Sequence, residues 1–202
     1  DVVSEERALL EDMATLIEDF CRWPVALKEP VGRLILSMSE GMHHYSLRKS
    51  EAGKLVLKNQ KEVNQYCFFV AGLVGEMLVA ISRQGRQCLT DAFRFGLFLQ
   101  KINLLKDQRG DEKQGRFLVP SRVAMVASLL RDATGAIRFV QTISLREKGF
   151  RLFCAWSLFL GLASLPWIAR NEREHELGRE HGAAGGHRIG RRAGRGGDSP
   201  RA

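Results

Sequence analysis

Residues 96–120 constrain the fold more than any other part of the sequence. This stretch places Gln100, Asn103, Asp107 and Asp111 at spacings of three, four and four residues. Because an α-helix advances about 100° per residue, all four fall within an arc of roughly 80°. Large apolar residues gather on the opposite side: Phe95, Phe98, Leu99, Ile102 and Leu105. The stretch therefore predicts a helix with one apolar face and one stripe of amide and carboxylate oxygens.

Two interpretations of this polar stripe are open. It is either a solvated helix surface or a site for Mg²⁺, which takes oxygen ligands, often one or two carboxylates together with substrate phosphates. Lys113 and Arg116 follow directly. Basic side chains beside carboxylates suit a metal–diphosphate site, because the cations would meet the phosphate oxygens.

The rest of the chain predicts an all-α protein. No stretch shows sustained alternation of apolar and polar residues, and 202 residues are enough for one domain with a core. Apolar periodicity and the placing of Pro and Gly predict helices over residues 4–20, 31–47, 62–83, 90–106 with an extension to 111, 121–132, 134–143 and 145–168. The four cysteines form no Cys-x-x-Cys pair and lie among apolar neighbours, which indicates reduced, buried thiols in a cytosolic protein.

The last predicted helix is nearly all apolar from Leu152 to Ala169. A run of about 18 residues is short for a membrane span, and Gly161 and Pro166 interrupt it. The pattern favours a buried central helix over membrane contact. Peripheral membrane association stays the alternative to a purely cytoplasmic location.

The final segment, residues 170–202, differs in composition from the body at 1–169. It holds eight Arg, eight Gly and five acidic residues, and accounts for +3 of the net charge of +8. With almost no large apolar residue it is predicted to be disordered. Three explanations are open: a solvated basic tail, a frameshift artefact, or a segment that binds anionic lipid or nucleic acid. No specific nucleic acid partner is expected.

Two sequence blocks resemble the squalene/phytoene synthase family. Residues 66–75, Tyr-Cys-Phe-Phe-Val-Ala-Gly-Leu-Val-Gly, are similar to its Tyr-Cys-x-x-Val-Ala-Gly-x-Val-Gly signature, and residues 96–120 resemble its second aspartate-rich motif. Weaker matches are residues 38–42 and 153–155. The resemblance runs from about residue 10 to residue 169. It implies an isoprenoid synthase-type helical bundle around a central prenyl cavity.

The resemblance also implies an activity. Members of this family join two prenyl diphosphates, such as farnesyl diphosphate, head to head through a cyclopropylcarbinyl diphosphate. Squalene synthases then reduce it with NADPH, whereas phytoene synthases lose a proton. The alternatives are a phytoene or presqualene diphosphate synthase, or an inactive fragment acting as a membrane-peripheral helical protein.

The implied site follows from the matched positions. Asn103, Asp107 and Asp111 would bind Mg²⁺, and Tyr66 would act with the two aspartates in catalysis. Substrate contacts are assigned to residues on three segments: Phe69, Gly72, Gln100, Asn103, Lys106, Lys113 and Arg116.

Two departures from the family pattern bear on function. No first aspartate-rich motif is found, so the chain is expected to lack its N-terminal part, and apolar surface is expected to be exposed where a wall of the cavity is missing. Ser157 and Leu158 stand where squalene synthases tend to have Pro-Gln, which places NADPH use in question.

Overall fold

The computed structural model describes residues 4–49, 52–82 and 85–185, with side chains described from residue 7 to residue 170. Contacts divide the chain into two units, Asp1–Ser164 and Leu165–Ala202. Of the second unit, the structure describes a helical backbone over residues 165–185. The predicted disordered tail at 170–202 overlaps this helix and otherwise falls outside the described residues, so it stays a prediction.

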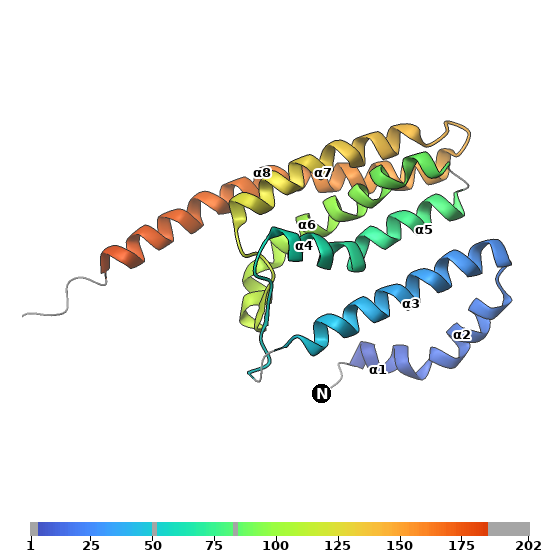
Figure 1. Ribbon diagram of the computed structural model, residues 1–202, viewed down its shortest axis with the longest axis horizontal. Helices are drawn as coiled ribbons and strands as arrows, with labels where there is room; N and C mark the ends of the chain where they lie inside the picture. Colours follow the sequence, from blue (N-terminus) through green and yellow to red (C-terminus); the bar gives the residue numbers. More distant parts are fainter. Residues whose placement is uncertain (1–3, 50–51, 83–84, 186–202) are drawn as a thin grey trace, which may run out of the picture. The chain divides into compact units, whose positions relative to one another are not determined.

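The first unit is built almost entirely from helices (Figure 1). In chain order the α-helices are α1 (Ser4–Glu11), α2 (Met13–Arg22), α3 (Val25–Leu47), α4 (Gln60–Cys67), α5 (Leu73–Ile81), α6 (Leu89–Lys113), α7 (Arg122–Thr142) and α8 (Lys148–Gly185), the last continuing into the second unit. A π-helix, Phe68–Gly72, joins α4 to α5, and a 3₁₀ turn, Arg86–Cys88, precedes α6. The prediction of an all-α protein is confirmed.

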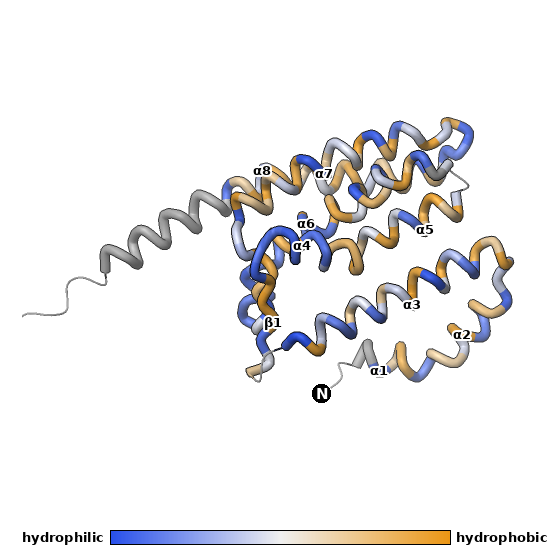
Figure 2. Tube along the Cα trace, viewed as in Figure 1, coloured by the Kyte–Doolittle hydropathy of each residue, from blue (hydrophilic) through white to orange (hydrophobic). Residues whose placement is uncertain are grey.

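Helix α6 forms the centre of the unit and packs against α7, α5 and the π-helix. Its buried face is the one that the apolar periodicity predicted, including Phe95, Phe98, Ile102 and Leu105. Figure 2 shows hydrophobic positions concentrated along α5 and the part of α6 beside it. The core thus surrounds the helix that carries the polar stripe.

Small residues let α6 approach the preceding helices closely. A Cβ atom at Gly75 would lie 2.1 Å from the Ala92 carbonyl oxygen, and one at Gly96 would lie 2.1 Å from the Ala71 carbonyl oxygen. Both distances are far below van der Waals contact, so each glycine is required by direct backbone-to-backbone packing.

The helix starts follow ordinary capping chemistry. The Asn59 side chain accepts a hydrogen bond from the Glu62 backbone N–H at 3.0 Å, and the Ser121 hydroxyl accepts one from Ala124 at 3.3 Å. Each satisfies a donor that the first helical turn would leave unpaired. These caps fix where α4 and α7 begin.

Several predicted boundaries were wrong. The helix predicted over 4–20 is divided near Asp12 into α1 and α2, whereas the two helices predicted over 121–132 and 134–143 are one continuous α7. The third helix begins at Val25 rather than Val31 and contains Pro30, which lies in its second turn. A proline there removes a single backbone hydrogen bond near the helix start, so the helix tolerates it.

The first three helices expose large apolar side chains, and the expectation of a missing cavity wall stays a prediction. None of the residues of α2 is buried, and large apolar side chains of α1 to α3 are exposed, including Leu10, Ile17, Val25 and Leu36. Cys21, on α2, is also exposed, so the prediction of four buried thiols was wrong at this position. The other three cysteines are buried and free.

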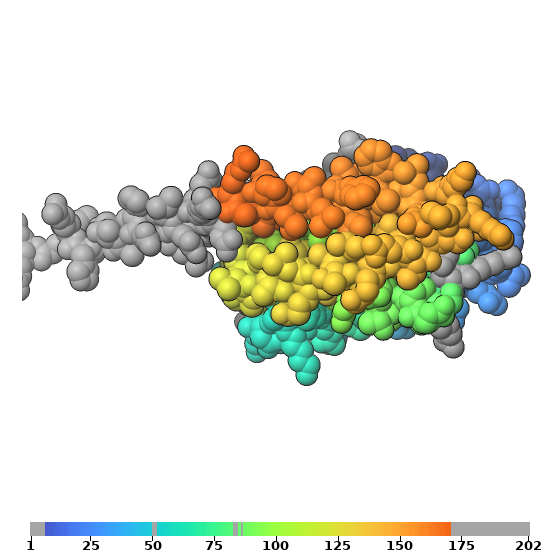
Figure 3. Space-filling view, turned by 90° about the horizontal axis from the view of Figure 1, so that it is seen from above, coloured from blue at the N-terminus to red at the C-terminus, as the bar shows by residue number. Residues whose placement is uncertain are grey.

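The predicted all-round burial of the last helix is also wrong. Within the first unit, α8 buries Cys154, Leu158 and Gly161, and Gly161 faces the ring of Phe98 on α6. Figure 3 shows α8 beside α7. The outer side of α8 exposes a row of large apolar residues: Leu152, Phe153, Trp156, Phe159 and Leu160. This α8 stripe, residues 152–160, is therefore surface and not core.

Candidate functional site

All four polar stripe residues lie on α6, as the spacing predicted. Asn103 and Asp107 are exposed, Gln100 is half-buried and Asp111 is buried. The helix continues unbroken to Lys113, so the two aspartates stand one turn apart on the same face.

Asp111 forms an ion pair with Arg116. The guanidinium Nη2 lies 2.7 Å from the Asp111 carboxylate oxygen Oδ1. Burial raises the pKa of the Asp111 carboxyl, the nearby Arg116 charge opposes this rise, and the Asp107 charge adds to it. The structure thus brings together Asp107, Asp111 and Arg116, three residues that the sequence proposed for one metal–diphosphate site.

A two-stranded parallel ladder fixes the backbone of Arg116. Strand β1 (Leu55–Val56) pairs with β2 (Arg116–Phe117), with Leu55 opposite Arg116. The Leu55 N–H donates to the Gly115 carbonyl at 2.9 Å. Gly115 has a φ of 77°, which glycine adopts without strain, so the chain can turn sharply from the end of α6 into β2. Such short strands give no periodic signal, and the sequence analysis missed them.

Tyr66 ends α4 on the same side as this ion pair. Tyr66 is 8 % exposed. Burial raises the pKa of its hydroxyl, the nearby Arg116 charge lowers this pKa, and the Asp111 charge raises it. The hydroxyl therefore stays protonated at neutral pH and can donate a hydrogen bond. Tyr66 thus lies within electrostatic range of Asp111 and Arg116, and its catalytic role stays a prediction.

A second tyrosine, Tyr45 on α3, supports Tyr66. The two rings meet edge to face with centroids 5.0 Å apart. The Arg48 guanidinium lies 5.3 Å from the centre of the Tyr45 ring and also pairs with Glu62 of α4 at 2.8 Å. The Tyr45 hydroxyl is buried and has no hydrogen-bond partner among the residues that the structure describes. Sequence reasoning missed Tyr45 because it lies outside both specific blocks.

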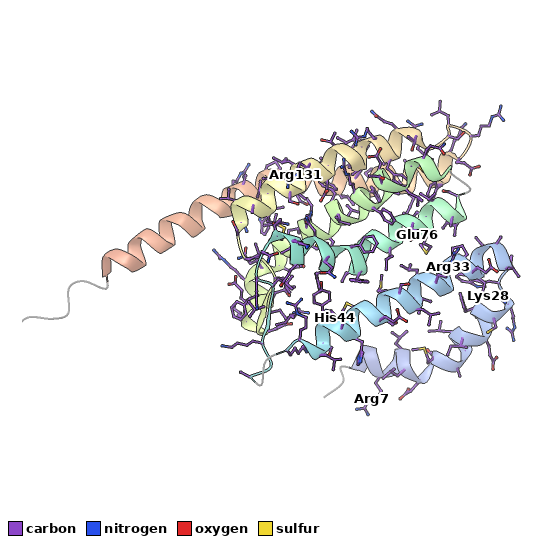
Figure 4. The ribbon with its side chains drawn as sticks, in the orientation of Figure 1. Arg7, Lys28, Arg33, His44, Glu76 and Arg131 are labelled. Carbon is purple, nitrogen blue, oxygen red and sulfur yellow. The ribbon has the colours of Figure 1, made fainter. Side chains whose placement is uncertain are left out.

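The remaining predicted residues are more dispersed. Phe69 packs over Gly41 of α3, where a Cβ would lie 2.5 Å from the Phe69 ring, and Gly72 faces the Leu97 side chain. Both contacts are typical of closely packed helices. Lys106 and Lys113 are exposed on α6. His43 and His44 of α3 are exposed; Figure 4 labels His44.

A small cavity separates α3 from α5. It has a volume of about 100 Å³ and is lined from both helices by apolar residues together with Arg33 and Glu76 (Figure 4). Small-molecule sites usually occupy roughly 300–1,000 Å³. This cavity is therefore too small for a long prenyl chain.

The donor set suits Mg²⁺ bound jointly with a phosphate ligand. Among the residues with described side chains, no three His, Cys, Asp or Glu side chains are close enough to form a metal site of their own. Two carboxylates with one amide oxygen match the way Mg²⁺ is held by few protein ligands plus substrate oxygens. The residues present fit that kind of site, with Asp107, Asp111 and Asn103 as the oxygen donors.

The fold defines a class of protein: an all-α chain whose central helix carries a stripe of aspartate and amide side chains. The sequence model of the family described as Squalene/phytoene synthase matches residues 4–126. The chain belongs to this family.

Curated relatives agree with this assignment. Squalene synthase of Schizosaccharomyces pombe is 23 % identical over 201 residues, which cover 83 % of this chain and 43 % of the relative. Squalene synthase of Eremothecium gossypii is 26 % identical over 84 % of this chain and 45 % of the relative. Squalene synthase of Ganoderma lucidum is 29 % identical over 59 % of this chain and 27 % of the relative. The chain therefore spans less than half the length of these relatives.

Proposed function

We propose that this chain provides part of the active site of a transferase that condenses two prenyl diphosphates head to head. The observation that carries the proposal is the grouping of Asp107, Asp111 and Arg116 beside Tyr66. The relatives bear the name squalene synthase, and farnesyl diphosphate is the substrate proposed here. The product is squalene or a related isoprenoid.

The residues have distinct proposed roles. Asp107, Asp111 and Asn103 hold Mg²⁺, which when bound would stabilise the charge on a departing diphosphate. Arg116, which pairs with Asp111 in the structure, would release it to contact the phosphate oxygens. The exposed Lys106 and Lys113 would provide further positive charge for the diphosphate.

Tyr66 has a different task. Its buried, protonated hydroxyl can donate a hydrogen bond, and its ring can stabilise positive charge on an allylic group through its π face. Gln100, half-buried one turn before Asn103, would orient the substrate. Phe69 and Gly72 would shape the space for the prenyl chain.

The second half of the reaction distinguishes the possible products. A squalene synthase consumes NADPH, whereas a phytoene or presqualene diphosphate synthase does not. Product analysis with and without NADPH separates these outcomes. Formation of the same product in both conditions would remove NADPH from the proposal.

Location at a membrane surface is proposed from the α8 stripe. The described residues include two helical stretches with the length and apolar composition of a span, Gln60–Ile81 and Lys148–Arg170. The first contributes to the core through α4 and α5, whereas the second exposes its apolar side. A cytoplasmic protein with peripheral membrane contact, with or without catalysis, is the second candidate function.

The central test is binding of inorganic diphosphate in the presence and absence of Mg²⁺, measured by titration calorimetry. Asp107→Ala should weaken the Mg²⁺-dependent affinity by at least about tenfold, with no change in helical content, because the side chain is exposed. Asp91→Ala is the matched control, since Asp91 is a carboxylate on the same helix that pairs with Arg138 instead.

Two results would contradict the proposal. Native affinity in Asp107→Ala would remove this residue from the metal site. Binding of diphosphate that does not depend on Mg²⁺ would assign the basic residues alone to anion binding. Salt-sensitive binding to anionic vesicles without any Mg²⁺-dependent diphosphate binding would favour the membrane-peripheral alternative.

A further inference from the structure

Helix α6, which carries the polar stripe, also carries a buried lysine, Lys101. Lys101 has no exposed surface, although it stands between Gln100 and Asn103 in sequence. Its ammonium group donates hydrogen bonds to the Ser128 hydroxyl at 2.7 Å and to the Asp132 carboxylate at 2.5 Å. Both partners belong to α7, so a charged contact joins α6 to α7 within the core.

The same network continues to the helix that carries Tyr66. The Ser128 hydroxyl lies 3.3 Å from the Asn64 side-chain oxygen, to which it donates. The Gln60 amide donates to the same oxygen at 3.0 Å. Asn64 precedes Tyr66 by two residues on α4. One polar network therefore joins α6, which carries the aspartates, α4, which carries Tyr66, and α7.

Stability alone does not explain this arrangement. Taking two charges out of water is costly, and well-packed apolar residues of similar volume often serve stability equally well or better. Apolar side chains such as Ile102 and Leu105 already attach the buried face of α6 to its neighbours. Such contacts fix how closely α6 packs, and the hydrogen bonds add a requirement on orientation, because a hydrogen bond weakens steeply with angle.

We propose that Lys101 and Asp132 are positioning residues that set the rotation of α6 relative to α4, and thereby hold the Asp107–Asp111 stripe against Tyr66. The catalytic use of this geometry rests on the proposed function. The geometric claim itself concerns only how the two halves of the site are aligned.

The test replaces the ion pair with apolar residues of similar size. In the Lys101→Met/Asp132→Leu double variant both charges are removed together, so no buried charge is left unpaired. The matched control is Asp91→Asn/Arg138→Gln, which removes the exposed pair joining the same two helices, 2.9 Å apart in the parent. Thermal unfolding establishes that both double variants remain folded.

Two measurements report on how α6 is oriented relative to α4. The chain has two tyrosines, so in a Tyr45→Phe background tyrosinate absorbance reports Tyr66 alone. The Met–Leu variant should move the titration midpoint of Tyr66 toward the ordinary value of 10.0, while the control leaves it unchanged. Calorimetry should show that Mg²⁺-dependent affinity for inorganic diphosphate falls at least about tenfold in the Met–Leu variant only.

An unchanged Tyr66 midpoint in the folded Met–Leu variant overturns the proposal, whatever its affinity for diphosphate. If the parent chain binds no diphosphate with Mg²⁺, the proposed function fails and the tyrosine titration alone decides the positioning claim. If the Met–Leu variant does not fold, Ser128→Ala takes its place, because it removes the bridge to Asn64 and leaves the ion pair. A smaller shift in the same direction is then expected, and no shift overturns the proposal.

Discussion

Gly96 offers the sharpest test of how α6 is packed. A Cβ there would lie 2.1 Å from the Ala71 carbonyl oxygen, whereas ordinary contact begins at 3.4 Å, so the two backbones would have to separate by about 1.3 Å. Overpacking of this kind costs about 1–3 kcal/mol, and the upper value applies because a backbone atom cannot turn aside. Alanine stabilises a helix by about 1 kcal/mol relative to glycine, which offsets part of this cost. Gly96→Ala should therefore lower the free energy of unfolding by about 2 kcal/mol.

Gly110 provides the control on the same helix. Nothing lies within 4 Å of a Cβ built at this position, so Gly110→Ala should be neutral or should stabilise the chain by up to about 1 kcal/mol. Urea unfolding followed by circular dichroism gives both values, and Gly96→Ala should lower the melting temperature by about 4–8 °C. A Gly96→Ala variant as stable as the parent would refute the close approach of α6 to Ala71. Equal destabilisation by both substitutions would refute the assignment of the loss to packing.

Three further predictions concern buried titratable or polar groups. Burial raises the pKa of Asp111, so the folded chain holds this proton more tightly than the unfolded chain, and stability falls as pH rises through the folded pKa. Asp111→Asn should therefore be more stable than the parent at neutral pH, and the difference should disappear in acid. Urea unfolding at both pH values measures this difference. A stability gain that grows in acid would contradict the raised pKa of Asp111. Tyr45→Phe removes a buried hydroxyl without a partner and should raise the free energy of unfolding by about 1 kcal/mol in the same assay, whereas a clear loss would mean that the hydroxyl is bonded. Thiol labelling of the native chain should modify Cys21 alone at a fast rate, because burial raises the pKa of Cys67 to about 12 and that of Cys154 to about 11. Rapid modification of a second thiol would contradict the burial of the core cysteines.

Residues with a local signal were predictable from the sequence. The apolar and polar sides of α6 follow from a period of 3.6 residues, and both are where the pattern placed them. The stripe from Gln100 to Asp111 was likewise recognisable, because its four positions lie on one helix. The all-α class required no more than such periodicity.

Features that depend on distant partners were not predictable. Lys101 lies outside the polar stripe on the helix, and only the fold shows that Asp132, 31 positions later, meets it in the core. Tyr45 and the β1–β2 ladder depend in the same way on contacts across the fold. The exposed side of α8 was misjudged because an apolar composition does not specify which side of a helix is covered.

The π-helix at Phe68–Gly72 has a consequence for how this segment tolerates change in length. Tyr66 and Gly75 are nine residues apart, which in a regular α-helix would put them on opposite sides, at about 180°. A π turn absorbs one additional residue, so their relative angle becomes that of an eight-residue separation, about 80°. Tyr66 can thus lie near Asp111 while Gly75 meets Ala92, both on α6. A related sequence could lose one residue between positions 68 and 72, form an ordinary helix there, and still present both residues to α6.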